Sequence, residues 1–316
     1  MQALTLARTK DMPREEWLAL RKQGIGGSDA AAILGLHPFA SALSVWADKT
    51  GRAPEIADNE YMWLGRVLEE PVARRIAEEN NIRIKRRHAI LRHPEHPWMI
   101  ADIDYEMVGQ RAGIEIKTTS QFNKTDFENG EIPPYYAIQC MHYMAVTGYP
   151  FWYLFVYVTG RKPYKFVIPR VEREIESLIL QEESFWNHHV LKDIMPEPDG
   201  SETSGKILKA TYPQAEKEYE PMFGYDDVCE DFLSLDKKIK ELEKLREEAR
   251  QCLQRAVGNA ERGECVDHIV RWTNCAGRTD IDKKALQADY PEIYERYLKT
   301  GEPSRRFSVM KKKEEG

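Results

Sequence analysis

The stretch that decides the fold is GIEIKTTS, residues 113–120. Side chains alternate between the two faces of an extended strand, so the two isoleucines point to one side while Glu115 and Lys117 point to the other. Isoleucine favours a half-buried strand position. The stretch therefore predicts a rigid strand that packs on a core through Ile114 and Ile116 and presents a carboxylate beside an ammonium on its other face.

The segments around this strand predict a mixed architecture. Upstream, residues 82–115 hold short alternating runs between turn signals, which is typical of an antiparallel meander. Downstream, residues 133–148 have a helical period and end on a glycine, and residues 151–160 form an apolar run expected of a buried strand. With further helices expected in residues 12–36 and 62–80, the fold class is α/β (α+β), a mixed central sheet flanked by helices.

A segment rich in proline, glycine and serine, MPEPDGSETSG (residues 195–205), divides the chain. We expect a core at residues 1–198, whose last helix begins near residue 172, and a mainly helical extension at residues 199–316. Apolar residues in the extension recur every three or four positions, which predicts a long amphipathic helix: Leu235, Ile239, Leu242, Leu245, Ala249, Leu253 and Ala256. This helix is either an oligomer contact or packs on its own domain.

The tail is expected to add three elements after Gly258, which closes the long helix. They are a strand at residues 265–272, a helix at 282–299 and a last strand at 305–310. Together they predict a small β element beside the long helix.

Composition limits the function classes. At 316 residues with 42% hydrophobic residues, the chain can bury a full core. It has no apolar run near the ~18 residues of a membrane span and no apolar core of a secretory signal, so we expect a cytoplasmic protein with no membrane partner. The five cysteines form no CxxC pair, which argues against a disulfide framework and against a zinc or iron–sulfur site.

The formal net charge of −6 does not exclude a polyanionic partner. Residues 214–250 hold 12 acidic and 7 basic residues, a net charge of −5, so nearly the whole excess lies in that segment. The rest of the chain is close to neutral and contains local basic clusters.

A second run of acids precedes the deciding strand. In WMIADIDYEMV, residues 98–108, strand alternation places Asp102, Asp104 and Glu106 on one face. Carboxylates this close repel one another, and solvent or a bound divalent cation relieves the repulsion. The sequence alone leaves two interpretations open, a metal site beside Lys117 or an exposed strand face with salt bridges.

A third acid lies on the predicted helix at residues 62–80. Glu69 falls on the apolar stripe that contains Val72, whereas Glu70 falls beside Arg74, which can pair with it. A carboxylate on an apolar stripe is costly without a partner such as a metal. We expect Pro71 to kink or restart this helix.

Four motifs in this order resemble a known family. They are GIGGSDAAAILG, GRVLEEPVARR, ADID before EIK, and YYAIQCMHYMAVTG. They resemble the YqaJ-like viral recombinase family, the phage-type relatives of lambda exonuclease in the PD-(D/E)XK nuclease superfamily. The resemblance is strong over about residues 15–160 and weak over the rest of the chain, and it implies a PD-(D/E)XK restriction-endonuclease-like core.

The resemblance also implies the site residues. It makes Glu69, Asp104 and Glu115 metal ligands together with the carbonyl of Ile116, and Lys117 the catalytic lysine. Gln139 becomes an active-site residue that orients water or phosphate, with an amide at the rim of a core helix as the alternative. The implied cofactor is Mg²⁺, with Mn²⁺ as a substitute. The family usually has a proline before the aspartate and a glycine after it, where this chain has Ile103 and Tyr105, so Asp102 stays open as the alternative to Asp104.

The implied function is that of a metal-dependent deoxyribonuclease. We expect a 5′ to 3′ exonuclease on double-stranded DNA ends that generates 3′ single strands for phage-type recombination, with a single-strand annealing protein as partner. Lambda-type relatives form ring-shaped trimers, so the resemblance also implies a homo-oligomer for this chain. The alternatives are a site- or structure-specific endonuclease of the same superfamily and a non-catalytic DNA-end-binding recombination factor.

Two basic features predict contacts to DNA phosphates. Ser28 or Asp29 caps a short helix that ends at Gly35, and its free N–H groups with Arg21 form an anion site. The resemblance makes Arg21 and Ser28 ligands of the DNA 5′-phosphate; the alternative is a simple cap and a surface charge. A second run, IRIKRRH, either lines a DNA channel or is a solvated edge: its basic residues are Arg83, Lys85, Arg86 and Arg87.

Overall fold

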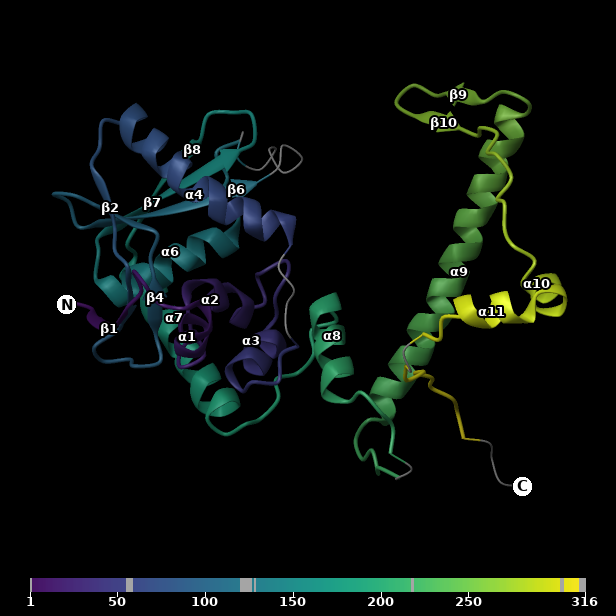
Figure 1. Cartoon of the computed structure of the whole chain (residues 1–316), viewed down its shortest axis with the longest axis horizontal. Coiled ribbons are helices and arrows are strands. Elements are labelled where there is room, and N and C mark those ends of the chain that lie inside the picture. The colour runs from purple at the N-terminus through teal and green to yellow at the C-terminus, as the bar shows by residue number, and fades with distance from the viewer. Residues whose placement is uncertain are drawn as a thin grey trace. The chain divides into compact units, whose positions relative to one another are not determined.

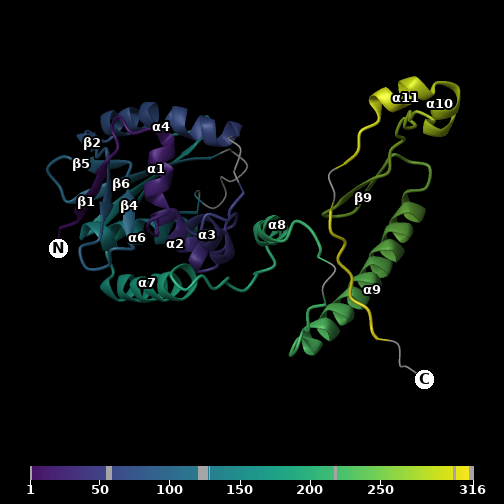
Figure 2. The same cartoon turned by 60° about the horizontal axis from the view of Figure 1, so that its bottom comes forward.

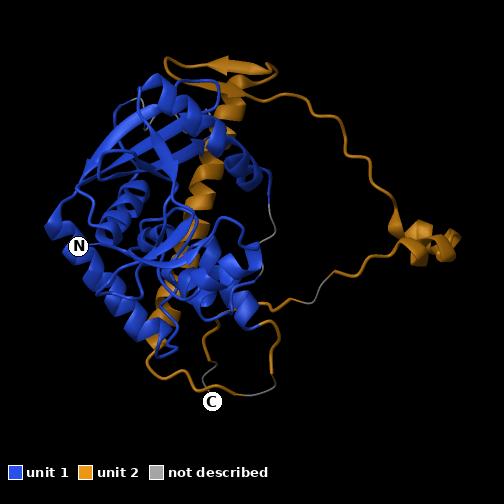
Figure 3. Ribbon diagram, turned by 60° about the vertical axis from the view of Figure 1, so that its left-hand side comes forward, with its two compact units in different colours: residues 1–212 blue, residues 213–316 orange. Residues whose placement is uncertain are grey.

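The computed structural model describes residues 2–54, 59–119, 127, 129–216, 219–301 and 304–312. The chain forms two compact units, Met1–Tyr212 and Pro213–Gly316 (Figure 3). The sequence-based boundary after residue 198 is earlier, because the segment that follows it forms a helix, α8 (Glu202–Thr211), that packs on α3 (Ala42–Lys49) of the first unit. Ser201 starts α8 by accepting a hydrogen bond from the backbone N–H of Ser204 at 3.1 Å, as expected of a serine N-cap.

The first unit contains most of the elements (Figure 1). In chain order they are β1 (Leu4–Arg8), α1 (Arg14–Arg21), α2 (Gly27–Ile33), α3, α4 (Glu60–Glu79), β2 (Ile84–Arg86), β3 (Ala89–Arg92), β4 (Ile100–Asp102), β5 (Tyr105–Met107), β6 (Ala112–Thr119), α6 (Pro134–Thr147), β7 (Phe151–Val158), β8 (Tyr164–Pro169), α7 (Glu172–Phe185), the π-helical turn η2 (Trp186–Val190) and α8.

The deciding strand, β6, lies at the centre of a five-stranded mixed sheet of order β2-β5-β6-β7-β8. β6 and β7 are parallel, while the other pairs are antiparallel. Parallel neighbours need a crossover connection, and α6 provides it. This confirms the predicted mixed central sheet flanked by helices.

Helices cover both faces of this sheet, with α4 on one side and α6 on the other (Figure 2). Ile114 and Ile116 pack in the core that includes Ile76 of α4. Trp152 and Leu154 of β7 pack with α6 in the other core. Because both faces of the sheet are covered by helices, the sequence of β7 is an almost continuous apolar run.

The predicted meander is instead divided between two sheets. β3 and β4 leave the central sheet and pair with β1 in a three-stranded antiparallel sheet. The expected single face for Asp102, Asp104 and Glu106 is therefore wrong. Glu106 lies buried in a separate pocket beside Arg87 and Tyr149. The alternation fails because the chain crosses from one sheet to the other between β4 and β5.

The N-terminal helices also differ from expectation. Gly26, rather than Ser28 or Asp29, is the N-cap of α2. Asp29 lies one turn inside and accepts a hydrogen bond from the backbone N–H of Gly26 at 2.9 Å. Gly35 follows α2 with a positive φ of 69°, as predicted for its end. This arrangement leaves the Ser28 hydroxyl available to other side chains.

Helix α4 continues through Pro71, where we expected a kink or restart. Its side chains follow the predicted division, because Val72 is buried and Arg74 pairs with Glu70 at 2.9 Å on the exposed face. Among the helices that the structure describes, none combines the length and the apolar character needed to cross a membrane.

The second unit contains α9 (Asp226–Val257), β9 (Arg262–Glu264), β10 (Ile269–Arg271), α10 (Lys283–Asp289) and α11 (Pro291–Tyr297). The predicted long helix and its end at Gly258 are confirmed. The helix expected at residues 282–299 is two helices, because Pro291 disfavours helical backbone at the preceding residue, Tyr290. The strand expected at residues 305–310 is wrong, since no regular structure is assigned there.

Candidate active site

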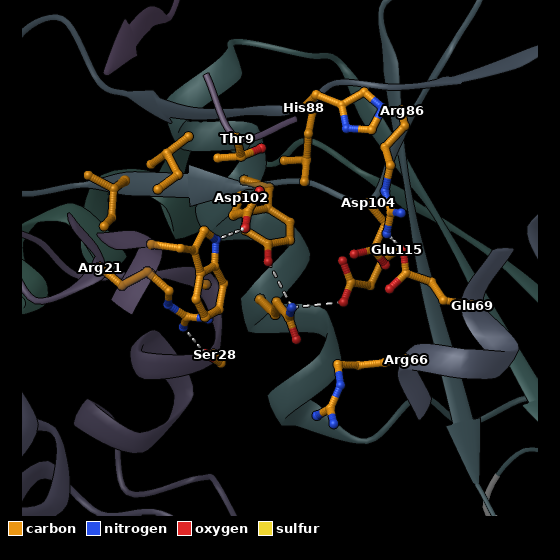
Figure 4. A pocket seen from close by; sticks show the side chains of 18 of the residues that line it. Thr9, Arg21, Ser28, Arg66, Glu69, Arg86, His88, Asp102, Asp104 and Glu115 are labelled. Atoms are coloured by element: carbon orange, nitrogen blue, oxygen red, sulfur yellow. Dashed lines mark hydrogen bonds and ion pairs between the residues drawn. The ribbon is translucent and has the colours of Figure 1, made fainter. Parts of the chain in front are cut away.

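A pocket of about 680 Å³ in the first unit is lined by residues from both sheets and from α1, α2, α4 and α6. Figure 4 shows Glu69, Asp104 and Glu115 together at one side, and Arg21 with Ser28 at the other. Most of the residues predicted for a site line this pocket: Arg21, Ser28, Glu69, Arg86, Asp102, Asp104, Glu115, Lys117 and Gln139.

The two charged residues of β6 line the pocket. With the isoleucines held in the core, Glu115 and Lys117 face the opposite side of the strand, as predicted. Lys117 Nζ lies 2.7 Å from Glu115 Oε1. Burial by itself would lower the pKa of Lys117, but the charges of Glu115 and Asp104 outweigh it and raise that pKa. The lysine is therefore a stable cation at neutral pH.

Tyr105 of β5 pairs with Ile114 of β6. Because these strands are antiparallel, the preceding residue Asp104 lies next to Glu115, the residue that follows Ile114. Its Oδ2 accepts a hydrogen bond from the backbone N–H of Ile116 at 3.0 Å. Burial, followed by the charges of Glu115 and Glu69, raises the pKa of Asp104 well above its usual range. These carboxylates thus repel one another in a confined space, which is the electrostatic setting that a cation relieves.

Glu69 reaches the same pocket from α4. Burial raises its pKa, the charge of Arg86 on β2 opposes this shift, and the charge of Glu115 adds to it. Glu69 forms an ion pair with Arg86. The helix acid is thus placed beside the strand acids, with a guanidinium as its partner.

Gln139 of α6 holds Glu115 from the other side. Its amide nitrogen donates hydrogen bonds to Glu115 Oε1 at 2.8 Å and to the Tyr143 hydroxyl at 2.9 Å. Gly27 makes room for this contact, because a Cβ at that position would lie 2.6 Å from Tyr143 Cε1. The geometry shows that Gly27 serves the packing of α2 on α6.

The far side of the pocket holds Arg21 beside Ser28. Arg21 Nη2 donates to the Ser28 hydroxyl at 3.1 Å, and its guanidinium carbon lies 4.8 Å from the ring centre of Trp17. The Trp17 indole N–H donates in turn to Asp102 Oδ2 at 2.7 Å. Asp102 is thus engaged with α1, whereas Asp104 lies against β6.

A buried ion pair sets the position of Arg21. Lys49 Nζ of α3 lies 2.7 Å from Asp29 Oδ2 and donates to the backbone carbonyl of Arg21 at 3.1 Å. Burial favours a higher pKa for Asp29, but the charges of Lys49 and Arg21 outweigh it and lower that pKa. One lysine therefore ties the end of α1 to the first turn of α2.

The basic run IRIKRRH does not act as one surface. Arg86 lines the pocket described above, whereas Lys85 and Arg87 pair with buried Glu106 at 3.3 Å each. Arg83 lines a separate pocket beside α4. Sequence reasoning treated these side chains as one group, but Lys85 and Arg86 are neighbours on β2 and point to opposite faces of the sheet.

Sequence reasoning missed Trp17 and Lys49. Trp17 had a signal, because it precedes Arg21 by four residues on one helix and side chains at that spacing meet. Lys49 had none, because its contacts to Asp29 and Arg21 join different helices.

The chain is similar to known proteins of one family. A family model described as the YqaJ-like viral recombinase domain matches residues 16–150. The chain is 34% identical over 316 residues to the uncharacterized protein YqaJ of Bacillus subtilis (strain 168), and the match covers 98% of both chains.

Solved structures of exonucleases are also similar. The alkaline exonuclease LHK-Exo from Laribacter hongkongensis has a TM-score of 0.48 and 20% identity, with 63% of this chain and 97% of that chain covered. A phage related exonuclease from Haemophilus somnus 129PT has a TM-score of 0.44 and 12% identity, with 56% of this chain and 100% of that chain covered. Because the chain is 34% identical to YqaJ over nearly its whole length and matches the family model, it belongs to the YqaJ-like viral recombinase family.

Proposed function

We propose that this protein is a metal-dependent deoxyribonuclease that hydrolyses phosphodiester bonds at the pocket between α4, β6 and α6. The observation that carries the proposal is the group made by Asp104, Glu115 and Lys117, in which the half-buried Asp104 and the buried Glu115 lie beside a lysine on a rigid strand. Such a group supplies both the ligands for a cation and a fixed positive charge for a phosphate.

The donor set fits a divalent cation. Glu115 Oε2 is buried and has no hydrogen-bond partner, which is costly for a carboxylate oxygen. Hard oxygen ligands suit Mg²⁺, with Mn²⁺ as a substitute. Within the described residues no three His, Cys, Asp or Glu side chains already form a group of metal ligands, and Glu69 is paired with Arg86. We therefore assign Asp104, Glu115 and the Ile116 carbonyl as the primary ligands, with Glu69 joining when it leaves Arg86.

When bound, the cation would polarise a phosphoryl oxygen and lower the pKa of a water molecule. The chain's own residues supply the rest. Lys117 remains protonated and holds the scissile phosphate or the attacking water. Gln139 fixes the orientation of Glu115 through its amide N–H, so that the carboxylate does not rotate away from the reacting group.

Linear duplex DNA is the substrate that we propose, cut in the 5′ to 3′ direction from its ends to leave 3′ single strands for recombination. Support comes from Arg21 and Ser28, which line the same pocket as the carboxylates and meet at 3.1 Å. A guanidinium and a hydroxyl bind a terminal phosphate well. The partner that we propose is a phage-type single-strand annealing protein, and a ring-shaped homotrimer is the assembly to test.

The proposed function is tested by incubating linear and circular duplex DNA with Mg²⁺, with and without a chelator. We expect progressive loss of the linear form only, and no cleavage once the metal is removed. Cleavage of the circle would instead favour a site- or structure-specific endonuclease. Binding without cleavage would favour a non-catalytic end-binding factor.

The polarity is tested with linear duplexes that carry either a 5′-phosphate or a 5′-hydroxyl. The phosphorylated end should be degraded faster, and Arg21→Ala should remove that preference while metal-dependent cleavage remains. Equal rates on both ends for the unmodified protein would refute the phosphate pocket and leave the nuclease assignment standing.

A further inference from the structure

A second pocket of about 560 Å³ lies on the outer face of α4. Four arginines line it together with two glutamates, Glu70 and Glu78. The arginines are Arg66, Arg74, Arg75 and Arg86. The patch therefore carries a net positive charge of about +2 in a chain whose formal net charge is −6. We call it the α4 groove.

The α4 groove adjoins the active-site pocket. Arg66 and Arg86 line both of them, and Figure 4 shows the two side chains beside the carboxylates of the active site. A polymer that enters the active-site pocket on this side therefore meets the groove arginines next. A small ligand bound at the carboxylates would not need them.

The spacing of the arginines suits a sugar–phosphate backbone. Arg66 and Arg74 are eight residues apart on α4, which is about 12 Å at the 1.5 Å rise of an α-helix. This length equals three to four nucleotides of a duplex strand at about 3.4 Å each. Arginine binds phosphate with a bidentate geometry.

The ion pairs of the groove do not oppose this role. Arg74 pairs with Glu70 at 2.9 Å and Arg75 with Glu79 at 2.9 Å, and both arginine side chains are strongly exposed, at 71% and 49%. Exposed pairs of this kind contribute little to stability, so the exchange of a carboxylate for a phosphate is inexpensive. The core side of α4, with Val72 and Ala73, is not involved.

We propose that the α4 groove binds the phosphate backbone of the DNA strand that continues beyond the active site. Arg74 and Arg75 make these contacts, which hydrolysis at the active-site pocket does not itself require. This inference rests on the proposed function, because it requires DNA as the ligand. It predicts a sequence-independent contact that is released by salt.

The test is the salt dependence of duplex DNA affinity, measured by fluorescence anisotropy in Ca²⁺ so that the substrate stays intact. Arg74→Gln with Arg75→Gln should reduce the slope of log K against log[salt] by about 1.8, since each phosphate contact contributes about 0.9. The matched control is Arg173→Gln with Lys192→Gln. It removes the same charge from exposed positions of the first unit that line neither pocket, and its slope should equal that of the unmodified protein.

An opposite change adds a second readout. Glu70→Gln with Glu78→Gln removes the two acids of the groove and should tighten binding. The groove proposal is overturned if the unmodified protein binds duplex DNA with a steep salt dependence but the Arg74/Arg75 variant matches the control. Absence of any DNA binding by the unmodified protein would overturn the proposed function, and the groove with it.

Discussion

At the scale of single residues, the site depends on charges that are buried only because each has a partner. Glu115 is held by Lys117 and Gln139, and Asp29 is held by Lys49. Removal of one partner leaves the other as an uncompensated charge, which costs far more than the pair contributes. The residues that position the pocket are therefore the most sensitive to substitution.

Lys49→Met is expected to lower the free energy of unfolding by about 3 kcal/mol, the usual cost of breaking a buried pair. The Lys49 side chain is only 1% exposed and that of Asp29 16%, so solvent cannot replace the lost partner. Urea denaturation measures the change. The matched control is Lys240→Met, whose pair with Asp236 lies on the exposed face of α9 and whose loss should leave the transition unchanged. An equally small effect of both substitutions would contradict the structural role of the Lys49–Asp29 pair.

At the scale of elements, close packing of α2 on α6 brings Ser28 into the pocket that holds the carboxylates. Gly27→Ala would place a methyl group 2.6 Å from Tyr143 Cε1 and 3.0 Å from Gln139 Cγ, so α2 or α6 must shift. We expect a loss of about 1 to 3 kcal/mol, the range for overpacking, measured by urea denaturation. Gly205→Ala in α8, where a Cβ meets nothing within 4 Å, should be neutral or stabilising. If the Gly27→Ala variant is as stable as the Gly205→Ala variant, this packing is refuted.

A buried pair also fixes α6 against α7 and β4. His142 Nδ1 lies 2.8 Å from Glu182 Oε1, and its Nε2 lies 2.8 Å from the carbonyl oxygen of Ile100. Burial lowers the pKa of His142, but the charge and hydrogen bond of Glu182 outweigh it and raise that pKa. Burial likewise raises the pKa of Glu182, against the charge of His142. The folded pair therefore keeps a proton that the unfolded chain releases.

This retained proton sets the sign of a pH dependence. The unfolded chain loses its protons near the ordinary pKa values of 4.5 for glutamate and 6.5 for histidine, so the stability from this pair should fall as the pH rises above them. The free energy of unfolding, measured in urea at pH 5 and pH 9, should decrease more for the unmodified protein than for His142→Gln with Glu182→Gln. Equal decreases would show that the pair holds no proton in the folded state.

The elements also show what the sequence could and could not predict. Period-two alternation placed Glu115 and Lys117 correctly, because β6 is long and both of its faces are covered. The same rule failed for Glu106, because a crossing between two sheets leaves no mark in the alternation. The N-cap of α2 was misplaced since Ser28 and Asp29 both suit a cap, and Lys49 was missed because its partners are distant in sequence.

At the scale of the whole molecule, the two units differ in their interiors. The apolar clusters of the described residues lie in the first unit, and α8 contributes Ile207, 4% exposed, to one of them. No described residue of α9 is buried. The first unit should therefore fold without the second.

A chain ending at Tyr212 is expected to unfold cooperatively, whereas a chain ending at residue 198 should be less stable by about 2 kcal/mol or more, since it loses α8 and the buried side chain of Ile207. Thermal denaturation followed by circular dichroism compares the two. Equal stabilities would support the boundary predicted from the linker, and a molten chain ending at Tyr212 would show that the second unit is needed for folding.

The central claim is that the pair on β6 hydrolyses DNA, and the most direct measurement is the rate of linear duplex degradation by Lys117→Ala in Mg²⁺. We expect a loss of at least ~100-fold, the scale of removing one positioned electrostatic group, while affinity for the same duplex in Ca²⁺ is retained. Lys162→Ala, at an exposed lysine outside the pocket, should leave the rate unchanged. Substantial residual degradation by Lys117→Ala would contradict the assignment of the site.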